Sequence, residues 1–245
     1  MDDLTRGMVE IRHVAGGTRA AYNAIYAGPG IRQPERLWSW LLDLIGARAG
    51  QRLLDVAGGE GQLLRHAAAR GLEAHAVDLS EVALARALAR APRAVVAVAN
   101  GEALPYPDGF FDRVVNFGSL EHYEDPLAGA REMARVLAPG GLACIQVPNT
   151  FGLRWNVLHA WRRGDVCDDG QPIQRYGTRA QWTALLAAGG LEVERVLGYE
   201  DLAALPAGPA GWLGALRHPS RLLVGLADRL PVEMASMFLF LCRRA

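Results

Sequence analysis

Arg52-Leu-Leu-Asp-Val-Ala-Gly-Gly-Glu-Gly61 joins a short apolar run to a loop that contains three glycines. The apolar half is typical of a strand buried on both faces of a parallel sheet. Glycines in the second half let the backbone turn tightly and approach a ligand closely. Residues 62–70 then have the pattern of a helix that stops at Gly71. A strand, a glycine loop and a helix in this order predict a ligand site at the positive N-terminus of the helix.

Strands and helices alternate on both sides of this loop. Strands are predicted at 52–57, 74–78, 94–98, 112–116, 142–147, 191–199 and 236–242. Helices are predicted at 35–45, 62–70, 80–91, 125–138, 178–188 and near 220–230, with Ser80 and Asp125 at the start of two of them. Apolar strands separated by helices indicate a Rossmann-like, doubly wound α/β sheet of seven strands with helices on both faces.

Length and charge narrow the possible functions. The 245 residues are consistent with a single domain, and 51% of them are hydrophobic. The 26 cationic side chains are all arginine and balance 26 acidic ones. Without lysine the chain forms no Schiff base and has no phosphate-binding lysine of a Walker A loop. A formal net charge of +0 also disfavours a broad basic surface for nucleic acid.

Cysteine usage and the first residues predict a soluble, cytoplasmic protein. The three cysteines are far apart and form no Cys-x-x-Cys pair, as expected in a reducing compartment. Met1-Asp2-Asp3 is acidic and no apolar stretch follows it, so no secretory signal is predicted. No apolar run approaches the ~20 residues that a membrane-spanning helix needs.

An acidic residue stands at the end of the second predicted strand of the sheet. Asp78 lies 17 residues after Gly61, where a carboxylate accepts hydrogen bonds from two ribose hydroxyls. The glycine loop and this acid together predict an adenosine-containing cofactor. The dinucleotide fingerprint Gly-x-Gly-x-x-Gly fails, however, because Leu64 occupies the place of its third glycine.

Residues 50–150 carry several segments that resemble motifs of the class I S-adenosylmethionine-dependent methyltransferases. Leu53–Gly61 resembles the first motif and Val77-Asp-Leu-Ser80 the second. Further resemblances are Ala99–Asp112 to the third motif, Leu120-Glu-His122 with Asp125-Pro126 to the segment after the fourth strand, and Arg135–Gly141 to the turn into the fifth. The chain resembles the small-molecule enzymes of the methyltransferase-11 or UbiE-like group. This implies S-adenosyl-L-methionine as cofactor, and a mostly parallel sheet whose last strand is antiparallel.

The resemblance also implies a role for each matching residue. The loop Ala57, Gly58, Gly59 and Gly61 is expected to line the methionine end of the cofactor, with Asp55 buried behind it. Asp78 is expected to hold the ribose, Leu79 to pack on the adenine, and Asn100, Gly101 and Glu102 to lie along the adenine edge. Backbone groups of Asn116, Phe117 and Gly118 are expected to face the amino group and the sulfonium. Tyr22 and Tyr26, four residues apart, are expected either to close over the methionine tail or to pack as one helix face.

Two residues depart from the family pattern. Ala57 replaces the commoner glycine, which is tolerated if its φ is negative. Asn100 replaces an aspartate, and its carbonyl can still accept a hydrogen bond from the adenine amino group. The Ala-Gly-Gly variant also resembles that of quinone C-methyltransferases, but the later proline-glycine signature expected of that group is absent.

The predicted reaction is an in-line methyl transfer that needs alignment and exclusion of water rather than a covalent nucleophile. A hydroxyl acceptor benefits from a general base, and His122 lies near the expected mouth of the site, either as that base or as a packed residue of the turn. The proposed lid contacts of the acceptor are Trp155, His159, Trp161, Gln171, Gln174 and Tyr176. No metal site is predicted, because the spacing of His159, Asp165, Cys167, Asp168 and Asp169 matches no standard zinc pattern.

The expected organisation is one methyltransferase domain over residues 1–245. It is divided into an N-terminal helical cap (1–49), a cofactor-binding core (50–147), an acceptor lid (148–178) and a C-terminal completion of the sheet (179–245). Residues 212–230 form an amphipathic segment that either packs on the sheet or touches a membrane surface or lipid acceptor. The acceptor is expected to be a small molecule. A nicotinamide-dependent oxidoreductase and a non-catalytic S-adenosylmethionine-binding partner subunit are the alternatives.

Overall fold

A seven-stranded sheet forms the centre of the protein in the computed structural model, which describes residues 3–13, 17–200 and 231–245. The strand order is β4-β3-β2-β5-β6-β9-β8. The strands are β2 (Arg52–Val56), β3 (Glu73–Asp78), β4 (Val95–Val98), β5 (Phe111–Phe117), β6 (Leu137–Pro148), β8 (Leu191–Tyr199) and β9 (Met237–Arg244). Only the pairs of β9 with β6 and with β8 are antiparallel. The predicted mostly parallel sheet with an antiparallel last strand is therefore confirmed.

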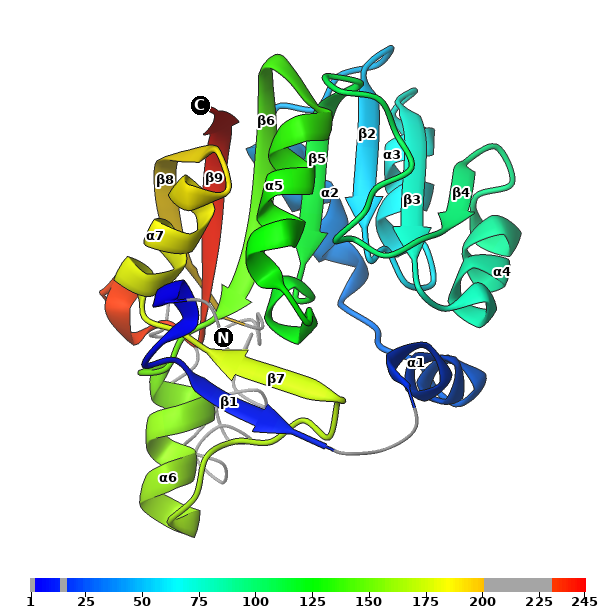
Figure 1. Cartoon of the computed structure of the whole chain (residues 1–245). Coiled ribbons are helices and arrows are strands. Elements are labelled where there is room, and N and C mark those ends of the chain that lie inside the picture. The colour runs from blue at the N-terminus through cyan, green and yellow to red at the C-terminus, as the bar shows by residue number, and fades with distance from the viewer. Residues whose placement is uncertain (1–2, 14–16, 201–230) are drawn as a thin grey trace, which may run out of the picture.

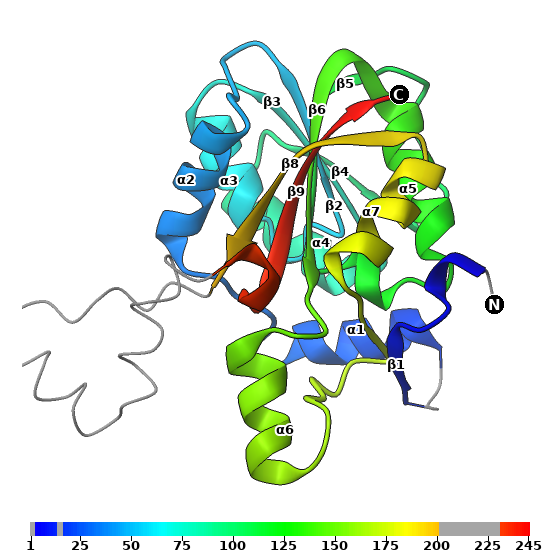
Figure 2. The same cartoon turned by 90° about the vertical axis from the view of Figure 1, so that its left-hand side faces the viewer.

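Helices cover both faces of this sheet and divide the core into two apolar clusters (Figure 2). On one face lie α2 (Glu35–Leu44), α3 (Gln62–Ala69) and α4 (Glu81–Arg90). On the other lie α5 (Pro126–Val136) and α7 (Arg179–Ala188). These helices fall where the sequence predicts them because their starts are encoded locally. Ser80 Oγ accepts from Ala83 N–H at 3.1 Å, and Thr178 and Gln181 form a capping box.

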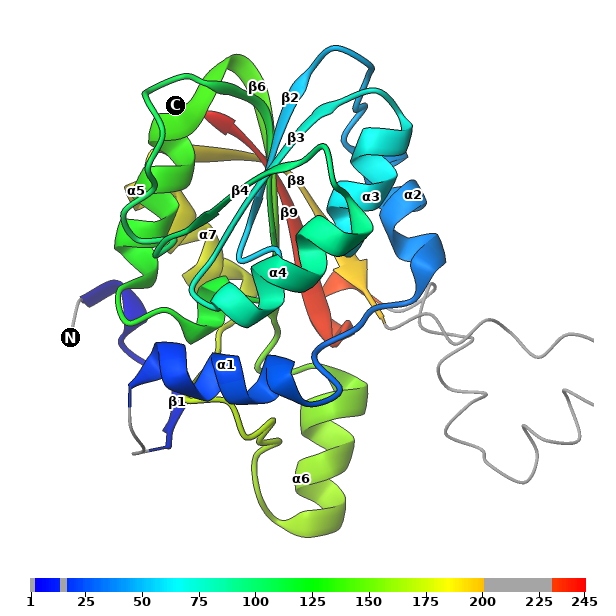
Figure 3. The same cartoon turned by 90° about the vertical axis from the view of Figure 1, so that its right-hand side faces the viewer.

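A second, two-stranded sheet is absent from the sequence-based prediction. It pairs β1 (Val9–Arg12) antiparallel with β7 (Ile173–Tyr176), so the region described as a helical cap also contains a strand. Both strands are four residues long and partly polar, and such runs give almost no periodic signal. With α1 (Thr18–Ala27), this β1–β7 ribbon lies beyond the end of the sheet where the parallel strands finish (Figures 1 and 3).

Residues 148–178 contain the short π-helix η3 (Leu153–Val157) and helix α6 (Leu158–Arg163) before β7. Helix α6 projects away from the sheet and buries none of its residues (Figure 1). The predicted helix near 220–230 and the amphipathic segment 212–230 lie outside the described residues. Across the part that is described, no helix combines the length and apolarity needed to cross a membrane.

Candidate functional site

A cavity of about 250 Å³ opens where β2, β3 and β5 end. This first cavity collects many of the residues that the sequence assigns to the cofactor: Tyr22, Tyr26, Ala57, Asp78, Leu79, Asn100, Gly101, Glu102, Phe117 and Gly118. His122 also lines it. Segments more than 100 residues apart in sequence therefore meet at one place, at the carboxyl end of the parallel strands.

The glycine loop adopts a left-handed backbone, and this corrects one expectation. Ala57 has a φ of 59°, not the negative value on which its tolerance was predicted to depend. Gly59 has a φ of 53°, which glycine adopts without strain. An alanine in this region carries a conformational cost of roughly 1–2 kcal/mol, so the surrounding packing must hold it there.

Asp78 ties this loop to the end of β3. Its Oδ2 accepts from the Gly59 N–H at 2.9 Å and its Oδ1 accepts from the Ser80 N–H at 2.8 Å. Burial raises the pKa of Asp78, and the hydrogen bonds from the backbone N–H groups partly offset that rise. Each carboxylate oxygen retains a further lone pair. The side chain can therefore accept two more hydrogen bonds from a ligand in the first cavity.

Asp55 lies buried behind the loop, as predicted. Its carboxyl group is so close to Gly58 that a Cβ there would lie 2.9 Å from Asp55 Cγ. Burial, and secondarily the charge of Asp78, raises the pKa of Asp55 to about 7. Gly61, which was predicted to line the methionine end of the cofactor, does not line the first cavity. A Cβ at Gly61 would lie 2.7 Å from Ala87 Cβ, so this glycine permits the close packing of α3 on α4.

Helix α1 closes the first cavity from the N-terminal side. Tyr26 Oη would lie 2.6 Å from a Cβ at Gly59, so the phenol covers the glycine loop directly. Burial raises the pKa of both Tyr22 and Tyr26. A network that the sequence did not reveal fastens this helix. The buried Glu60 carboxylate pairs with Arg32, Arg86 and Arg90, and Arg86 also donates to the carbonyls of residues 27 and 28.

The opposite wall depends on Tyr123, which the sequence also did not reveal. A Cβ at Gly101 would overlap Tyr123 Oη, so only glycine fits beside this ring. Asn116 is buried and does not line the first cavity. Its Nδ2 donates to Val56 O at 3.3 Å and to Tyr123 Oη at 3.1 Å. Asn100 Oδ1 accepts from the Glu102 N–H at 3.0 Å, which uses one of its two lone pairs.

His122 lies on the turn η2 (Leu120–His122) with a defined tautomer. Its Nδ1 is hydrogen-bonded to the carbonyl oxygen of Ile173, which only accepts, so Nδ1 carries the proton. Nε2 is then the free base, 3.7 Å from Glu121 Oε1 and 3.9 Å from Asp169 Oδ2. Burial lowers the pKa of His122, which keeps the imidazole neutral. This arrangement suits proton acceptance at Nε2.

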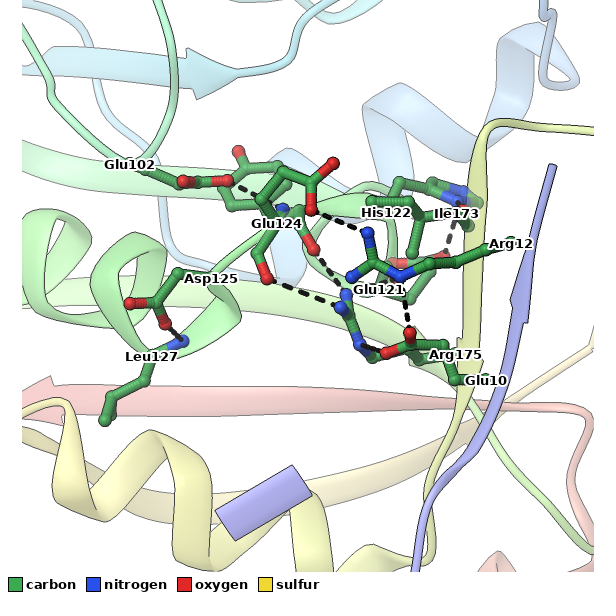
Figure 4. Close-up of polar contacts among 11 residues, drawn as sticks. Glu10, Arg12, Glu102, Glu121, His122, Glu124, Asp125, Leu127, Ile173 and Arg175 are labelled. Carbon is green, nitrogen blue, oxygen red and sulfur yellow. Dashed lines mark hydrogen bonds and ion pairs between the residues drawn. The ribbon is translucent and has the colours of Figure 1, made fainter. Parts of the chain in front are cut away.

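Strand β7 holds this turn through a second residue, Arg175, whose contacts Figure 4 shows. Its side chain is buried, with an exposed fraction of 3%. Its guanidinium donates to the carbonyls of Tyr123 and, at 3.4 Å each, of Glu121 and Glu124. Arg175 Nε also donates to Glu10 Oε2 on β1 at 2.7 Å. Because Ile173 and Arg175 belong to the same strand, the β1–β7 ribbon fixes both the tautomer of His122 and the backbone that carries it.

A second cavity of about 190 Å³ adjoins the first and shares Tyr26, Ala57, Phe117 and His122 with it. Of the predicted acceptor contacts, Trp155, Gln171 and Gln174 line it. Three others do not: His159 and Trp161 lie on the projecting α6, and Tyr176 donates its hydroxyl to Cys167 O at 2.7 Å. Glu121, Trp38 and Tyr199 line the second cavity without having been predicted. Among the residues with described positions, no cluster of His, Cys, Asp and Glu is arranged to hold a metal ion.

Residues 54–145 match a family described as "Methyltransferase domain". The chain is 38% identical over 109 residues to a demethylmenaquinone methyltransferase of Beutenbergia cavernae. The match covers 44% of this chain and 45% of that protein. The chain is 37% identical over 170 residues to the 27-O-demethylrifamycin SV methyltransferase of Amycolatopsis mediterranei. This match covers 65% of this chain and 60% of that protein. The chain thus spans about half the length of these curated relatives.

Two solved structures share the fold. The 1,6-didemethyltoxoflavin-N1-methyltransferase of Burkholderia thailandensis, with S-adenosylhomocysteine bound, has a TM-score of 0.64 at 16% identity, covering 97% of this chain and 95% of that one. A chain in a complex that contains the Trm112 methyltransferase activator of Haloferax volcanii has a TM-score of 0.67 at 21% identity, with 95% and 99% covered. Residues 54–145 thus carry a methyltransferase domain, and with the sheet order these likenesses show that the chain around it has the fold of these methyltransferases.

Proposed function

We propose that the protein transfers the methyl group of S-adenosyl-L-methionine to a small-molecule acceptor. The observation that carries this proposal is the position of the Asp78 carboxylate. It is bonded to the glycine loop and faces a cavity whose neighbour contains the neutral imidazole of His122. His122 lines both cavities and the loop residues Gly58 and Gly59 line the second, so a candidate base lies where the two cavities meet.

The residues present fit this cofactor. Asp78 has lone pairs for two ribose hydroxyls, and Leu79 offers an apolar surface for adenine. At Gly59 and Gly101 a side chain would overlap a tyrosine, so the backbone is kept free of Cβ atoms on both walls. Asn100 would accept from the adenine amino group through its remaining lone pair. The backbone at Ala57, Phe117 and Gly118 would face the methionine end.

The bound cofactor would supply an activated methyl group on a positively charged sulfur. The task of the chain is then to align the acceptor and to keep water away, for which well-oriented groups supply effective molarities on the order of 10⁵ M or more. Tyr22 and Tyr26 cover the site from α1. His122 Nε2 would accept the proton that a hydroxyl or amine acceptor loses on methylation.

A small-molecule acceptor is supported by the confined volume of the second cavity and by the relatives. The Amycolatopsis and Burkholderia proteins are named for methylation of a rifamycin and of a toxoflavin precursor. Residues 148–178 supply Trp155, Asp169 and Gln174 to the second cavity, which supports their role as the acceptor lid. Location in the cytoplasm and the absence of a nucleic-acid partner stay predictions from the sequence. The comparisons favour neither the oxidoreductase nor the non-catalytic alternative.

The test is calorimetric titration of the purified chain with S-adenosylhomocysteine and, separately, with NADH. We expect micromolar binding of S-adenosylhomocysteine and no measurable binding of NADH. Asp78→Ala should weaken S-adenosylhomocysteine at least 30-fold, since two hydrogen bonds to a charged acceptor are lost, at about 1.5–3 kcal/mol for each such bond. Binding of NADH in preference to S-adenosylhomocysteine would refute the proposed function.

A further inference from the structure

The second cavity has a lining with a distinct electrostatic character. Three carboxyl groups line it, those of Glu60, Glu121 and Asp169. No arginine appears among its described lining residues, although arginine supplies every cation of the chain. The charge of Glu60 is already neutralised by three arginines that approach it from outside the cavity. Glu121 and Asp169 have no such partner among the described ion pairs with arginine.

Two buried acceptor atoms in this lining lack a hydrogen-bond partner. Glu121 is 2% exposed and its Oε2 accepts from no described group. Gln174 is 3% exposed and its Oε1 is likewise without a partner. A buried polar atom without a hydrogen-bond partner destabilises the fold, so native structures seldom retain two in one cavity without a function. A ligand that donates hydrogen bonds would satisfy both.

Burial raises the pKa of Glu121 to about 8. At neutral pH this carboxyl is mostly protonated, and a positive charge beside it would favour its ionised form. A negative charge would raise its pKa further and would face Asp169, with no arginine in the described lining to offset the repulsion. Trp38 adds one unpartnered indole N–H to the same lining, but a neutral donor does not counter two carboxyl groups. Trp38, Trp155 and Tyr199 also supply aromatic surface.

We propose that the second cavity binds an acceptor that presents a hydrogen-bond donor, an amine or a hydroxyl, to Glu121 and Gln174 and carries no negative charge there. This inference rests on the proposed function, since it assigns the acceptor class to the same site. Phosphate and carboxylate acceptors are excluded. Aromatic or planar apolar groups beside the donor would contact the three aromatic side chains of the lining.

The experiment uses the full chain saturated with S-adenosylhomocysteine and three probes of equal shape: benzylamine, benzyl alcohol and benzoate. Affinities are measured by saturation-transfer NMR titration. We expect benzylamine and benzyl alcohol each to bind at least tenfold more tightly than benzoate. Preference for the amine over the alcohol identifies a cationic donor, and equal binding identifies a neutral one. Benzoate binding as tightly as the other two overturns the inference.

Two variants assign the preference to its residues. Glu121→Gln removes the carboxyl group that a bound cation would ionise and should reduce the ratio between amine and benzoate at least fivefold. Gln174→Met removes the second acceptor at similar volume and should weaken both donor probes. Glu192→Gln, on an exposed part of β8, is the matched control and should change nothing.

Titration with S-adenosylhomocysteine separates the possible failures. If the wild-type chain fails to bind it, the proposed function fails. If the wild-type chain binds it but shows no preference among the probes, the acceptor assignment alone fails. If Glu121→Gln weakens S-adenosylhomocysteine itself more than tenfold, the carboxyl group serves the cofactor, which also overturns the acceptor assignment.

Discussion

The two cavities of this site are built in different ways. Much of the first is lined by short segments that each follow a strand of the parallel sheet, at residues 57, 78–79, 99–102 and 117–119, and helix α1 and the turn η2 complete it. The second depends on the pairing of Val9 with Tyr176 and on turns that those strands hold in place. Local sequence therefore specifies the cofactor side, whereas contacts across most of the chain specify the acceptor side. A change at a residue that makes no contact essential to the cofactor should therefore affect the acceptor side more than the cofactor side, although residues such as Tyr26 and Phe117 line both cavities.

The strongest test of this separation is His122→Ala. Loss of a positioned general base lowers turnover about 10²–10⁴-fold, while the affinity for S-adenosylhomocysteine should change less than threefold. Turnover is measured as the S-adenosylhomocysteine released in the presence of an amine or alcohol that the wild-type chain methylates. Turnover within threefold of wild type would assign His122 to packing alone. An equal loss of cofactor affinity would show that the two sides are not separate.

An intermediate effect is expected from Arg175→Met. Its loss leaves Glu10 Oε2 and three backbone carbonyls without the donor that Arg175 supplies, so the turn η2 should become less ordered and kcat should fall about tenfold. A positioning role has a specific signature in nitrogen NMR of labelled histidine. The wild-type signal of a single tautomer with Nδ1 protonated should become a mixture in the variant.

Arg12→Met is the matched control for Arg175. Its side chain is 45% exposed and pairs with Glu10 and Glu124 at the surface, where such pairs contribute at most about 1 kcal/mol. We expect an unchanged histidine signal and kcat within twofold of wild type. A wild-type histidine signal in Arg175→Met would contradict a role for the ribbon in orienting His122.

The smallest effect concerns Asp55, on the cofactor side. Its pKa is about 7 in the folded protein and about 4 in the unfolded chain, so the folded state binds more protons between these values. Its contribution to the free energy of unfolding is therefore complete below pH 4 and is lost as the pH rises through 7. Asp55→Asn does not titrate, so its stability should fall about 2–3 kcal/mol less than that of wild type between pH 5 and pH 8. Urea unfolding at both pH values measures this, and parallel losses would refute the raised pKa.

Particular residues show where prediction from the sequence succeeds and where it ends. Asp78 and the glycine loop were identifiable because each lies beside the strand that positions it. The backbone of Ala57 was not, since residue type alone does not determine φ at a ligand loop. Tyr123 and Glu60 act on partners 22 to 30 residues away, and no spacing rule links them. His159 and Tyr176 had suitable chemistry, but their position depends on how α6 and β7 leave the sheet.

Strand β9 lies between β6 and β8, although β6 and β8 both precede it in the sequence. During synthesis, one edge of β6 therefore keeps its backbone hydrogen-bonding groups unpaired until residues 237–244 have been made. An open strand edge of this kind is a template for pairing with other chains. Pairing of β9 with β6 must therefore occur before this edge of the nascent sheet is protected from aggregation. Substitutions in β9 should accordingly lower the yield of folded protein more than their effect on equilibrium stability suggests.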